Sequence, residues 1–584
     1  MKRYTPWALA LFFGVIYLLT PTALYYWDGI VFASLCEEGT PHQLLHPHHL
    51  LYNLILDIIY EILHLHLPNL RALPFLIWVS SIFGALTIYF SHLIFRTIFN
   101  REGLAAATTS FMGFSFTFWH FSTDANAYII SAFFPILAAY LMISMNDAVK
   151  PRIRMLWACL SFTIGMLLHQ VVVFFYPVYF FWLLAFRYKD KNLKKSIPAR
   201  LVLLVLPGLM VGITYFLMGR IFFQFETFDE YFGWTTAYGH QARWWFGSKN
   251  SGFYPFIKAV GLSHLSLMFY PDYIRFGLFN FDNLSFEDII KKFVALVSIL
   301  TVILVFVRGL IYLVGAVGRR RFYAALLLIW IIPYVAFFTF FTPQFEFYRL
   351  YYLFPLMVIF ALGLKGFFEK PTFEHLDLPI SPNTLSGWVL ILFLIFAVYN
   401  GALGIHPQMF PANNPWLNDA TTFANGTPAN AVMVVPWSDE NMEEYSRVAN
   451  LVSYFGTQGV LFAEPVESIM GPMPEIVGPP PVLDDVIQPV AWDKIEVRPG
   501  LNPKIELSYF HEDMLDGRFE GWHLFQYQFP DTKIPIEGTV RLPDASQCRT
   551  EQFGRIKYQR GVDEYLILDK EDNFQWQQDL LEFL

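Results

Sequence analysis

Charged residues are scarce in this sequence. Asp, Glu, Lys and Arg make up 15% of its 584 residues, whereas soluble globular proteins usually carry about 25%. Hydrophobic residues make up 55%, and many apolar runs reach the roughly 20 residues that a helix needs to cross a bilayer. The composition argues against an ordinary soluble protein and predicts an α-helical protein that crosses the membrane many times.

The sequence also lacks the motifs of several protein classes. Its three cysteines are too few for a disulfide framework or a cysteine metal cluster. It contains no glycine-rich phosphate-binding loop and no nucleophile elbow, so nothing in it supports ATP-driven transport or serine hydrolysis. The formal net charge of −8 argues against nucleic acid as a partner.

Basic residues set the expected topology. Lys2 and Arg3 place the start of the first span inside by the positive-inside rule. The run 155–186 is too long for one crossing and is basic at both ends, so we divide it near His169 (a re-entrant hairpin is the alternative). About eleven spans result. They are expected at 7–26, 72–95, 104–121, 126–145, twice within 155–186, and at 200–219, 292–314, 323–341, 350–367 and 386–404.

Two outside segments join these spans at the outer face. The first, 27–71, contains a stretch at 50–66 in which polar residues recur at helical spacing, which predicts an amphipathic helix lying on the interface. The second, 220–290, is long and rich in aromatic residues. Loops of such length are usually functional or folded onto the membrane.

The composition becomes polar after the last span. We therefore divide the chain into a transmembrane domain, 1–405, and a soluble domain, 406–584. An apolar run at 431–435, a helical pattern at 440–454 and a second apolar run at 459–463 predict a βαβ-like unit, followed by a β-rich end beyond about residue 490. The odd number of spans places this α/β domain outside the membrane.

Ionisable residues gather just after the first span. Asp28 follows interfacial aromatic residues and is a candidate base, although it could equally cap a helix. Glu37 is a candidate substrate ligand or part of a hydrated surface. His46, His48 and His49 are candidates for phosphate or substrate binding, or are simply hydrated. Their spacing lacks the usual i, i+4 geometry of helical metal ligands and does not favour zinc.

Later loops supply further candidates. Asp124 and Asn126 lie in a short turn, where such residues are favoured for backbone reasons alone, and are also candidate substrate ligands. His169 lies deep in apolar sequence, which makes it either a functional residue or a buried hydrogen-bonding one.

Arginine in the outside loops is a candidate for holding phosphate. Arg349 suits this role because a guanidinium group matches phosphate oxygens. Glu346, three residues earlier, is a further candidate for substrate binding, and the alternative is that the two residues simply pair with each other. Arg243 and His264 in the long loop are further candidates for substrate binding.

Several of these stretches resemble the GT-C superfamily of membrane glycosyltransferases. That family carries an acidic residue just after its first span, which is Asp28 in Tyr26-Trp27-Asp28-Gly29; Gly29 stands where the family usually has a second acidic residue. The stretch from His46 to Tyr52 is similar to a His-Pro segment of a bacterial branch related to protein O-mannosyltransferases. The runs 118–128 and 416–445 resemble the same branch.

The resemblance implies a GT-C-like bundle in the inner (plasma) membrane of a bacterium. It implies an inverting transfer of a sugar from a polyprenyl-phosphate donor to a protein or glycan acceptor outside. Asp28 would be the base, and Arg349 with one histidine of 46–49 would hold the phosphate. No cofactor is certain, and a divalent metal stays open. Residues 406–584 would recruit the acceptor or a protein partner.

Two other functions remain open from the sequence. A transporter would show polar residues in the middle of several spans and related halves, whereas the polar residues here gather at the outer ends. A catalytically silent scaffold subunit of a larger membrane complex would use the soluble domain to bind its partner.

Overall fold

The computed structural model describes most of the N-terminal 414 residues and short pieces beyond them. These are residues 4–25, 27–39, 41–147, 150–185, 197–236, 245, 253–271, 274, 285–315, 319–369, 382–414, 417, 431–434, 451, 454, 461–463 and 523–526. Contacts divide the chain into two compact units. The bundle unit comprises Met1–Thr22 and Leu44–Met409, and the tail unit comprises Ala23–Gln43 and Phe410–Leu584.

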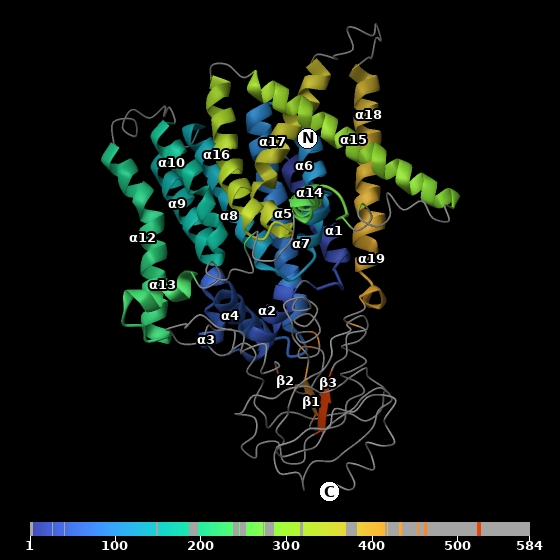
Figure 1. Ribbon diagram of the computed structural model, residues 1–584. Coiled ribbons are helices and arrows are strands. Elements are labelled where there is room, and N and C mark those ends of the chain that lie inside the picture. The colour runs from blue at the N-terminus through green and yellow to red at the C-terminus, as the bar shows by residue number, and fades with distance from the viewer. Residues whose placement is uncertain are drawn as a thin grey trace, which may run out of the picture. The chain divides into compact units, whose positions relative to one another are not determined.

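Helices make up the described part of the bundle unit (Figure 1). The α-helices are α1 (Thr5–Leu19), α4 (Tyr52–His64), α5 (Ala72–Phe99), α6 (Glu102–Gly113), α7 (Phe116–Ser122), α8 (Ala127–Ile143), α9 (Pro151–Leu168), α10 (Tyr176–Ala185), α12 (Ile197–Phe222), α13 (Phe228–Thr236), α14 (Phe253–Leu265), α15 (Phe286–Val314), α16 (Arg319–Phe340), α17 (Leu350–Glu369), α18 (Pro382–Val398) and α19 (His406–Gln408). Short 3₁₀ helices lie at Pro47–His49, Ser144–Asp147, Gln170–Phe175 and Phe347–Arg349, and a π-helix spans Tyr399–Ile405.

Each expected span contains a helix, but not all of these helices are long. Seven described helices are long and apolar enough to cross a membrane, and an eighth crossing results if α7 and α8, which meet at 111°, count as one. The other expected spans are represented by α1, α6, α8 and α10, with 15, 12, 17 and 10 residues. A straight crossing takes about 20 residues, so the prediction of about eleven spans is only partly confirmed.

Two helix breaks show how local hydrogen bonds shape the bundle. The division predicted near His169 is confirmed, since α9 ends there with the residue extended (φ −161°, ψ 122°). The single helix expected over 104–121 is wrong, because the chain breaks between α6 and α7. There the Ser115 hydroxyl donates to the Met112 carbonyl at 2.6 Å, a side-chain bond that competes with continued helix.

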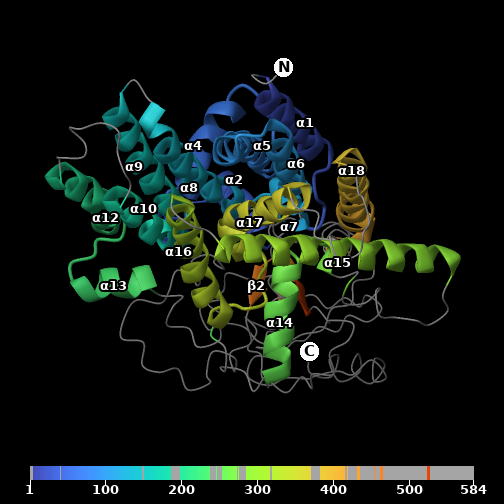
Figure 2. The same cartoon turned by 90° about the horizontal axis from the view of Figure 1, so that it is seen from above.

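Helices α15 and α17 cross at unusually close range. In both views α15 runs obliquely across the neighbouring helices (Figures 1 and 2). A Cβ atom at Gly309 would lie 2.0 Å from the Ile359 carbonyl oxygen, and one at Gly363 would lie 1.9 Å from that of Val305. Each helix therefore presents a glycine to the other's backbone, as is common where membrane helices pack closely.

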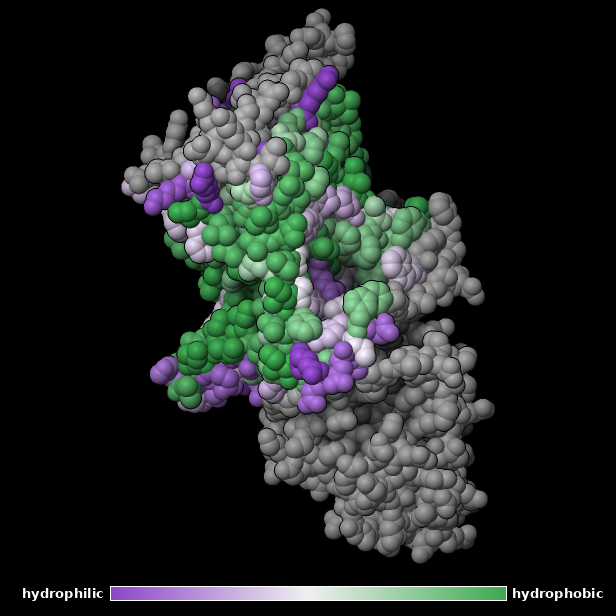
Figure 3. Space-filling view, turned by 90° about the vertical axis from the view of Figure 1, so that its left-hand side faces the viewer, coloured by the Kyte–Doolittle hydropathy of each residue, from purple (hydrophilic) through white to green (hydrophobic). Residues whose placement is uncertain are grey.

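Helix α12 shows how the bundle exposes apolar surface. Only 11% of its apolar membrane-length stretch is buried. One face of the molecule is broadly hydrophobic, with hydrophilic residues toward its margins (Figure 3). Contiguous apolar surface of this extent is typical of a membrane or partner contact. It agrees with an integral membrane protein.

Helix α4 is the amphipathic helix expected at 50–66, and it has three distinct faces. The buried face consists of Tyr52, Asn53, Leu56 and Tyr60. A second, exposed face consists of Ile55, Ile58, Ile59 and Ile62. Asp57 and Glu61, four residues apart, lie on a third face between these two. An exposed apolar stripe beside an acidic one suits a membrane interface, and that location stays a prediction.

The tail unit combines a helix from the first outside segment with a small sheet. Its described elements are α2 (Trp27–Glu38), α3 (Pro41–Leu44) and the strands β1 (Ala431–Val434), β2 (Leu461–Ala463) and β3 (His523–Gln526). The strands are parallel in the order β2-β1-β3, with Val432 paired to Leu461 and to Leu524. Strands β1 and β2 lie within the apolar runs at 431–435 and 459–463, and the soluble α/β domain expected over 406–584 stays a prediction. Most of the helix predicted at 440–454 lies outside the described residues.

Candidate functional site

Four histidines from two separate stretches meet in the bundle unit. His46, His48 and His49 lie in or beside the 3₁₀ turn Pro47–His49, and His169 lies between α9 and the next 3₁₀ turn. The rings of His49 and His169 are 4.4 Å apart and nearly perpendicular. The rings of His46 and His49 stack at 5.7 Å. The candidate ligands predicted at 46–49 and at 169 therefore belong to one cluster, which we call the imidazole cluster.

Backbone contacts hold the imidazole cluster in place. The Leu51 N–H donates to the Leu167 carbonyl at 3.0 Å, which joins the start of α4 to the end of α9. The Tyr215 hydroxyl of α12 donates to the Pro47 carbonyl, and Gln170 donates to the Tyr215 hydroxyl at 3.1 Å. These bonds fix the His-Pro-His-His turn against three helices, so its side chains are positioned rather than left on a loose loop.

Aromatic residues from two further stretches complete the cluster. Tyr128 of α8 lies 5.3 Å from His169 between ring centroids, and it stacks on Phe347 at 4.2 Å. Tyr348 lies 5.9 Å from Tyr128 and 6.2 Å from His169. Sequence reasoning noted Tyr128 within a motif but assigned a role neither to it nor to Tyr348, since aromatic residues are common throughout the chain.

Burial keeps the histidines of the turn neutral. It lowers the pKa of His46 to about 4, and burial with the adjacent His46 lowers the pKa of His48 to about 3. Burial and the nearby histidines, His169 first, hold the pKa of His49 well below its usual range. At pH 7 these rings therefore act through hydrogen bonds and not through positive charge.

His169 offers a buried hydrogen-bond donor. Its Nδ1 accepts a hydrogen bond from the Val171 N–H at 3.2 Å, so in the neutral ring the proton sits on Nε2. That Nε2 atom is buried and has no protein partner within the described residues. A buried donor without an acceptor costs about 1–3 kcal/mol, which suits a site that receives a phosphate or hydroxyl oxygen.

In the turn between α7 and α8, polar side chains form hydrogen bonds to nearby backbone groups. Asn126 caps α8 by accepting from the Ile129 N–H at 3.0 Å, and its amide donates to the carbonyls of Phe121 and Asp124. Asp124 is fully buried and accepts from the Ala125 N–H at 2.8 Å. The bonds of Asn126 match the backbone role left open in the sequence. A substrate role for either residue stays a prediction.

Arg349 is fully buried. Its Nη2 donates to the Ser263 hydroxyl and to the carbonyls of Phe338 and Pro343 at 3.0–3.1 Å. Its Nε and Nη1 atoms have no partner within the described residues. Within that part of the chain its guanidinium forms no ion pair with Glu346 or with another carboxylate. A buried cation of this kind is costly unless an anion joins it.

Of the two candidates in the long loop, the structure describes His264 but not Arg243. His264 has both ring nitrogens engaged, Nδ1 with the Val260 carbonyl at 2.8 Å and Nε2 with the Tyr352 hydroxyl at 2.9 Å. It lies one residue from Ser263, which receives a bond from Arg349. Arg243 lies outside the described residues.

Asp28 and Glu37 belong to the tail unit and lie on one helix. The sequence predicted a loop, whereas the structure forms α2, with Asp28 in its first turn. An acidic residue in the first turn is favoured by the helix dipole. Glu37 lies near the other end, where its Oε1 accepts from the Tyr454 hydroxyl at 2.9 Å. Within the described residues, no group of three or more His, Cys, Asp or Glu could hold a metal ion.

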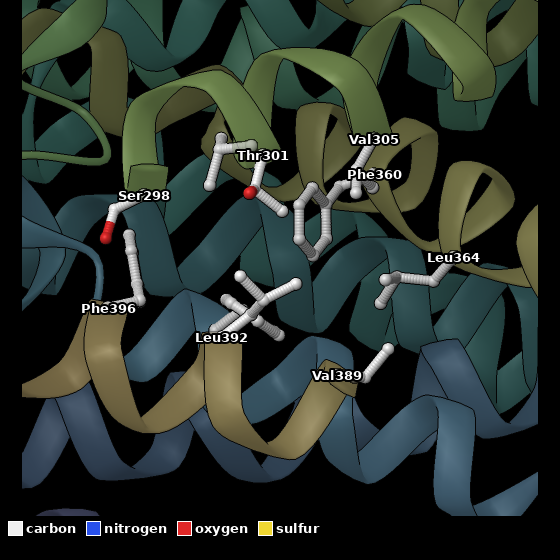
Figure 4. Close-up of a pocket in the computed structure, with 10 residues that line it drawn as sticks. Ser298, Thr301, Val305, Phe360, Leu364, Val389, Leu392 and Phe396 are labelled. Atoms are coloured by element: carbon white, nitrogen blue, oxygen red, sulfur yellow. The ribbon is translucent and has the colours of Figure 1, made fainter. Parts of the chain in front are cut away.

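An apolar cleft lies elsewhere in the bundle unit. It is lined by Phe111, Ser298, Thr301, Val302, Val305, Phe360, Leu364, Val389, Leu392 and Phe396, contributed by α6, α15, α17 and α18 (Figure 4). Two hydroxyl groups are its only polar side chains. Such a lining suits hydrocarbon and offers nothing to a charged group.

Part of the chain matches a known family. Residues 46–215 match a family described as dolichyl-phosphate-mannose-protein mannosyltransferase. This range begins at the imidazole cluster and ends at Tyr215, and it contains His169, Asp124 and Asn126. It does not contain Asp28, Glu37 or Arg349. No curated protein matches the chain.

Solved structures that match this chain share little sequence with it. The ArnT protein of Cupriavidus metallidurans bound to undecaprenyl phosphate is 13% identical over 78% of this chain and 85% of its own, with a TM-score of 0.46. The oligosaccharyltransferase of Archaeoglobus fulgidus is 14% identical over 77% of this chain, with a TM-score of 0.42. The chain spans 63% of the length of that archaeal enzyme.

The family match bears on the resemblance predicted from the motifs. The match covers two of the stretches that carry that resemblance, at His46–Tyr52 and 118–128. It also extends over the residues between and beyond them, from 46 to 215. The resemblance is therefore confirmed: the chain is similar to GT-C membrane glycosyltransferases and, over residues 46–215, to the protein mannosyltransferase branch.

Proposed function

We propose that the protein is an inverting glycosyltransferase that moves a sugar from a polyprenyl-phosphate donor to an acceptor on the outer face of the membrane. The observation that carries the proposal is the imidazole cluster within the family match. Residues 46–49, 128 and 169 are far apart in the sequence, and they meet through ring contacts of 4.4 to 6.3 Å. Convergence of motif residues in one place is what a binding site requires.

The leaving lipid phosphate needs hydrogen-bond donors or positive charge around it. Two groups in the bundle unit fit this need. His169 has a buried Nε2–H without an acceptor, and Arg349 has two buried donors without partners among the described residues. Tyr348, which precedes Arg349, packs beside His169. We assign the donor phosphate to these two residues, with the histidines of 46–49 contacting donor oxygens as neutral donors.

The acceptor hydroxyl must lose its proton as it attacks the anomeric carbon. We assign this base role to Asp28 in the first turn of α2. The acceptor oxygen bonds to the anomeric carbon as the bond from that carbon to the phosphate oxygen breaks, and the proton passes to the carboxylate. A single in-line displacement of this kind inverts the configuration.

The expected topology supports transfer on the outer face. Residues 23–43 and the tail fold into one compact unit, so they lie on the same side of the membrane. The basic N-terminus predicts that this side is the outside. We propose a bacterial inner membrane on the basis of the family resemblance.

The experiment is an Asp28→Asn variant in proteoliposomes. They receive polyprenyl-phosphate mannose, the donor class in the description of the matching family, and envelope proteins as acceptor. We expect kcat to fall at least about 100-fold, the lower range of a lost general base. Asp57→Asn is the matched control, because Asp57 lies on the acidic face of α4 outside the proposed machinery. Full activity of the Asp28 variant would remove the base role from Asp28, whereas a correctly inserted wild type that transfers no sugar would favour the scaffold function.

A further inference from the structure

The segment that carries Asp28 is tied to the tail at both of its ends. At the first end, the Asn414 amide donates to the Ala23 carbonyl at 2.8 Å. At the second, the Tyr454 hydroxyl donates to the Glu37 carboxylate at 2.9 Å. Asn414 and Tyr454 follow the last span, so these bonds join residues about 400 positions apart in the chain.

The residues that supply both bonds from the tail, Asn414 and Tyr454, are themselves buried. Asn414 is 1% exposed, and its second amide atom accepts from the Leu417 N–H at 3.0 Å. Tyr454 is 6% exposed. The bond of Asn414 to Ala23 lies away from water, so losing one partner leaves the other buried and unsatisfied, which makes this bond expensive to break. The bond of Tyr454 to Glu37 is part-buried, because Glu37 is half-buried.

Helix α2 depends on such contacts for its position. It has 12 residues, and isolated helices shorter than about 12–15 residues are marginal in water. Ile30, Ala33 and Cys36 are at most 1% exposed, so packing within the tail unit, and not intrinsic helix stability, sets where the helix lies. Asp28 and Glu37 are rigidly related because they occupy the two ends of one short helix.

We propose that the tail positions Asp28, and that Tyr454 and Asn414 are positioning residues for catalysis. This inference rests on the proposed function. It gives the tail a role beyond the recruitment of an acceptor or partner. It also makes Glu37 the anchor of α2 instead of a ligand for substrate. A displacement of a reacting group by about 1 Å costs about 100-fold in rate. Loss of the bond between Glu37 and Tyr454 would let α2 move, and with it the Asp28 carboxylate, so the rate should fall.

The test uses the full-length protein in lipid vesicles and removes one hydroxyl group. Tyr454→Phe deletes only the donor to Glu37. We expect kcat to fall about 10- to 100-fold while KM for polyprenyl-phosphate mannose stays within about twofold. Glu37→Ala should show the same loss, and Glu37→Gln, which keeps an acceptor oxygen, should recover most of it. Tyr60→Phe is the control, because it removes a comparable hydroxyl bond, to the Leu70 carbonyl, in the bundle unit.

A second measurement does not depend on activity. Amide hydrogen exchange of residues 27–38 should quicken in Tyr454→Phe and not in Tyr60→Phe. An active wild type whose Tyr454→Phe variant keeps its kcat overturns the positioning role alone. If the wild type transfers no sugar, but exchange of residues 27–38 is still faster in Tyr454→Phe than in the wild type, the proposed function is contradicted. The bond between Tyr454 and Glu37 is then still supported.

Discussion

Individual polar side chains in the bundle unit are paired to very different degrees. Asn126 uses its whole amide, and both ring nitrogens of His264 are engaged. His169 and Arg349, by contrast, keep buried donors without a partner among the described residues. Native proteins leave few buried donors unsatisfied. Other described residues, such as Asn53 and Tyr334, also have buried polar atoms without a partner among the described residues. His169 and Arg349 are the two of this kind that we propose as phosphate ligands, so an oxygen-rich ligand that pairs their donors would lower the free energy.

His169→Asn tests the residue proposed to contact phosphate. The asparagine oxygen can replace Nδ1 as the acceptor of the Val171 N–H, since Asn commonly bonds two residues onward, but the Nε2 donor is lost. A hydrogen bond to a charged group is worth about 1.5–3 kcal/mol, so KM for polyprenyl-phosphate mannose should rise about 10- to 100-fold. Steady-state transfer in proteoliposomes measures it. His64→Asn is the control, and an unchanged KM would remove His169 from the site.

Residue types in the loops could be predicted, but their partners could not. The histidines of 46–49 and His169 stood out because ionisable groups are rare in apolar sequence. Their ring contacts required the fold of α4, α8 and α9. Arg349 was expected in an outside loop next to the mouth of the bundle. Its full burial, and the bonds of its Nη2 to the carbonyls of Phe338 and Pro343, could not be read from the sequence.

Elements pack through features that hydropathy does not show. The apolar runs predict helices well, and the basic flanks correctly divide the run at His169. The hydropathy pattern does not predict the helix break at Ser115, where a side chain bonds to the backbone. It also does not predict α2, a helix that belongs to the tail unit. The crossing of α15 and α17 depends on two glycines that hydropathy cannot distinguish from other small residues.

Gly363→Ala should weaken the crossing of α15 and α17. The new methyl group would lie 1.9 Å from the Val305 carbonyl oxygen, and backbone cannot yield cheaply, so the helices must separate. Overpacking of this kind costs about 1–3 kcal/mol. Gly212→Ala in α12 is the matched control, because its methyl group would meet nothing within 4 Å; it should gain up to about 1 kcal/mol from helix propensity. Thermal unfolding in detergent compares them, and equal midpoints would contradict the close crossing.

The whole chain folds as two units that do not follow the order of the sequence. The tail unit draws on residues 23–43 and 410–584. The predicted boundary after the last span cannot reveal this, because composition reports only where polarity changes along the chain. Bonds such as that between Glu37 and Tyr454 arise from tertiary contact alone. The topology of the tail is nonetheless constrained, since both of its segments must share one side of the membrane.

Cysteine labelling tests that side directly. Ala412→Cys places a thiol at an exposed position just after the last span, and Gly103→Cys places one at an exposed position beside Arg101, at the end expected to lie inside. With Cys548 changed to Ser, the remaining Cys36 and Cys159 are buried. A membrane-impermeant maleimide added to intact bacterial cells lacking an outer membrane should label the thiol at 412 and not at 103. Permeabilised cells should show both. Because the positive-inside rule and the shared unit fix the same orientation, labelling at 103 alone would invert the topology and place Asp28 on the side away from any outer-face acceptor.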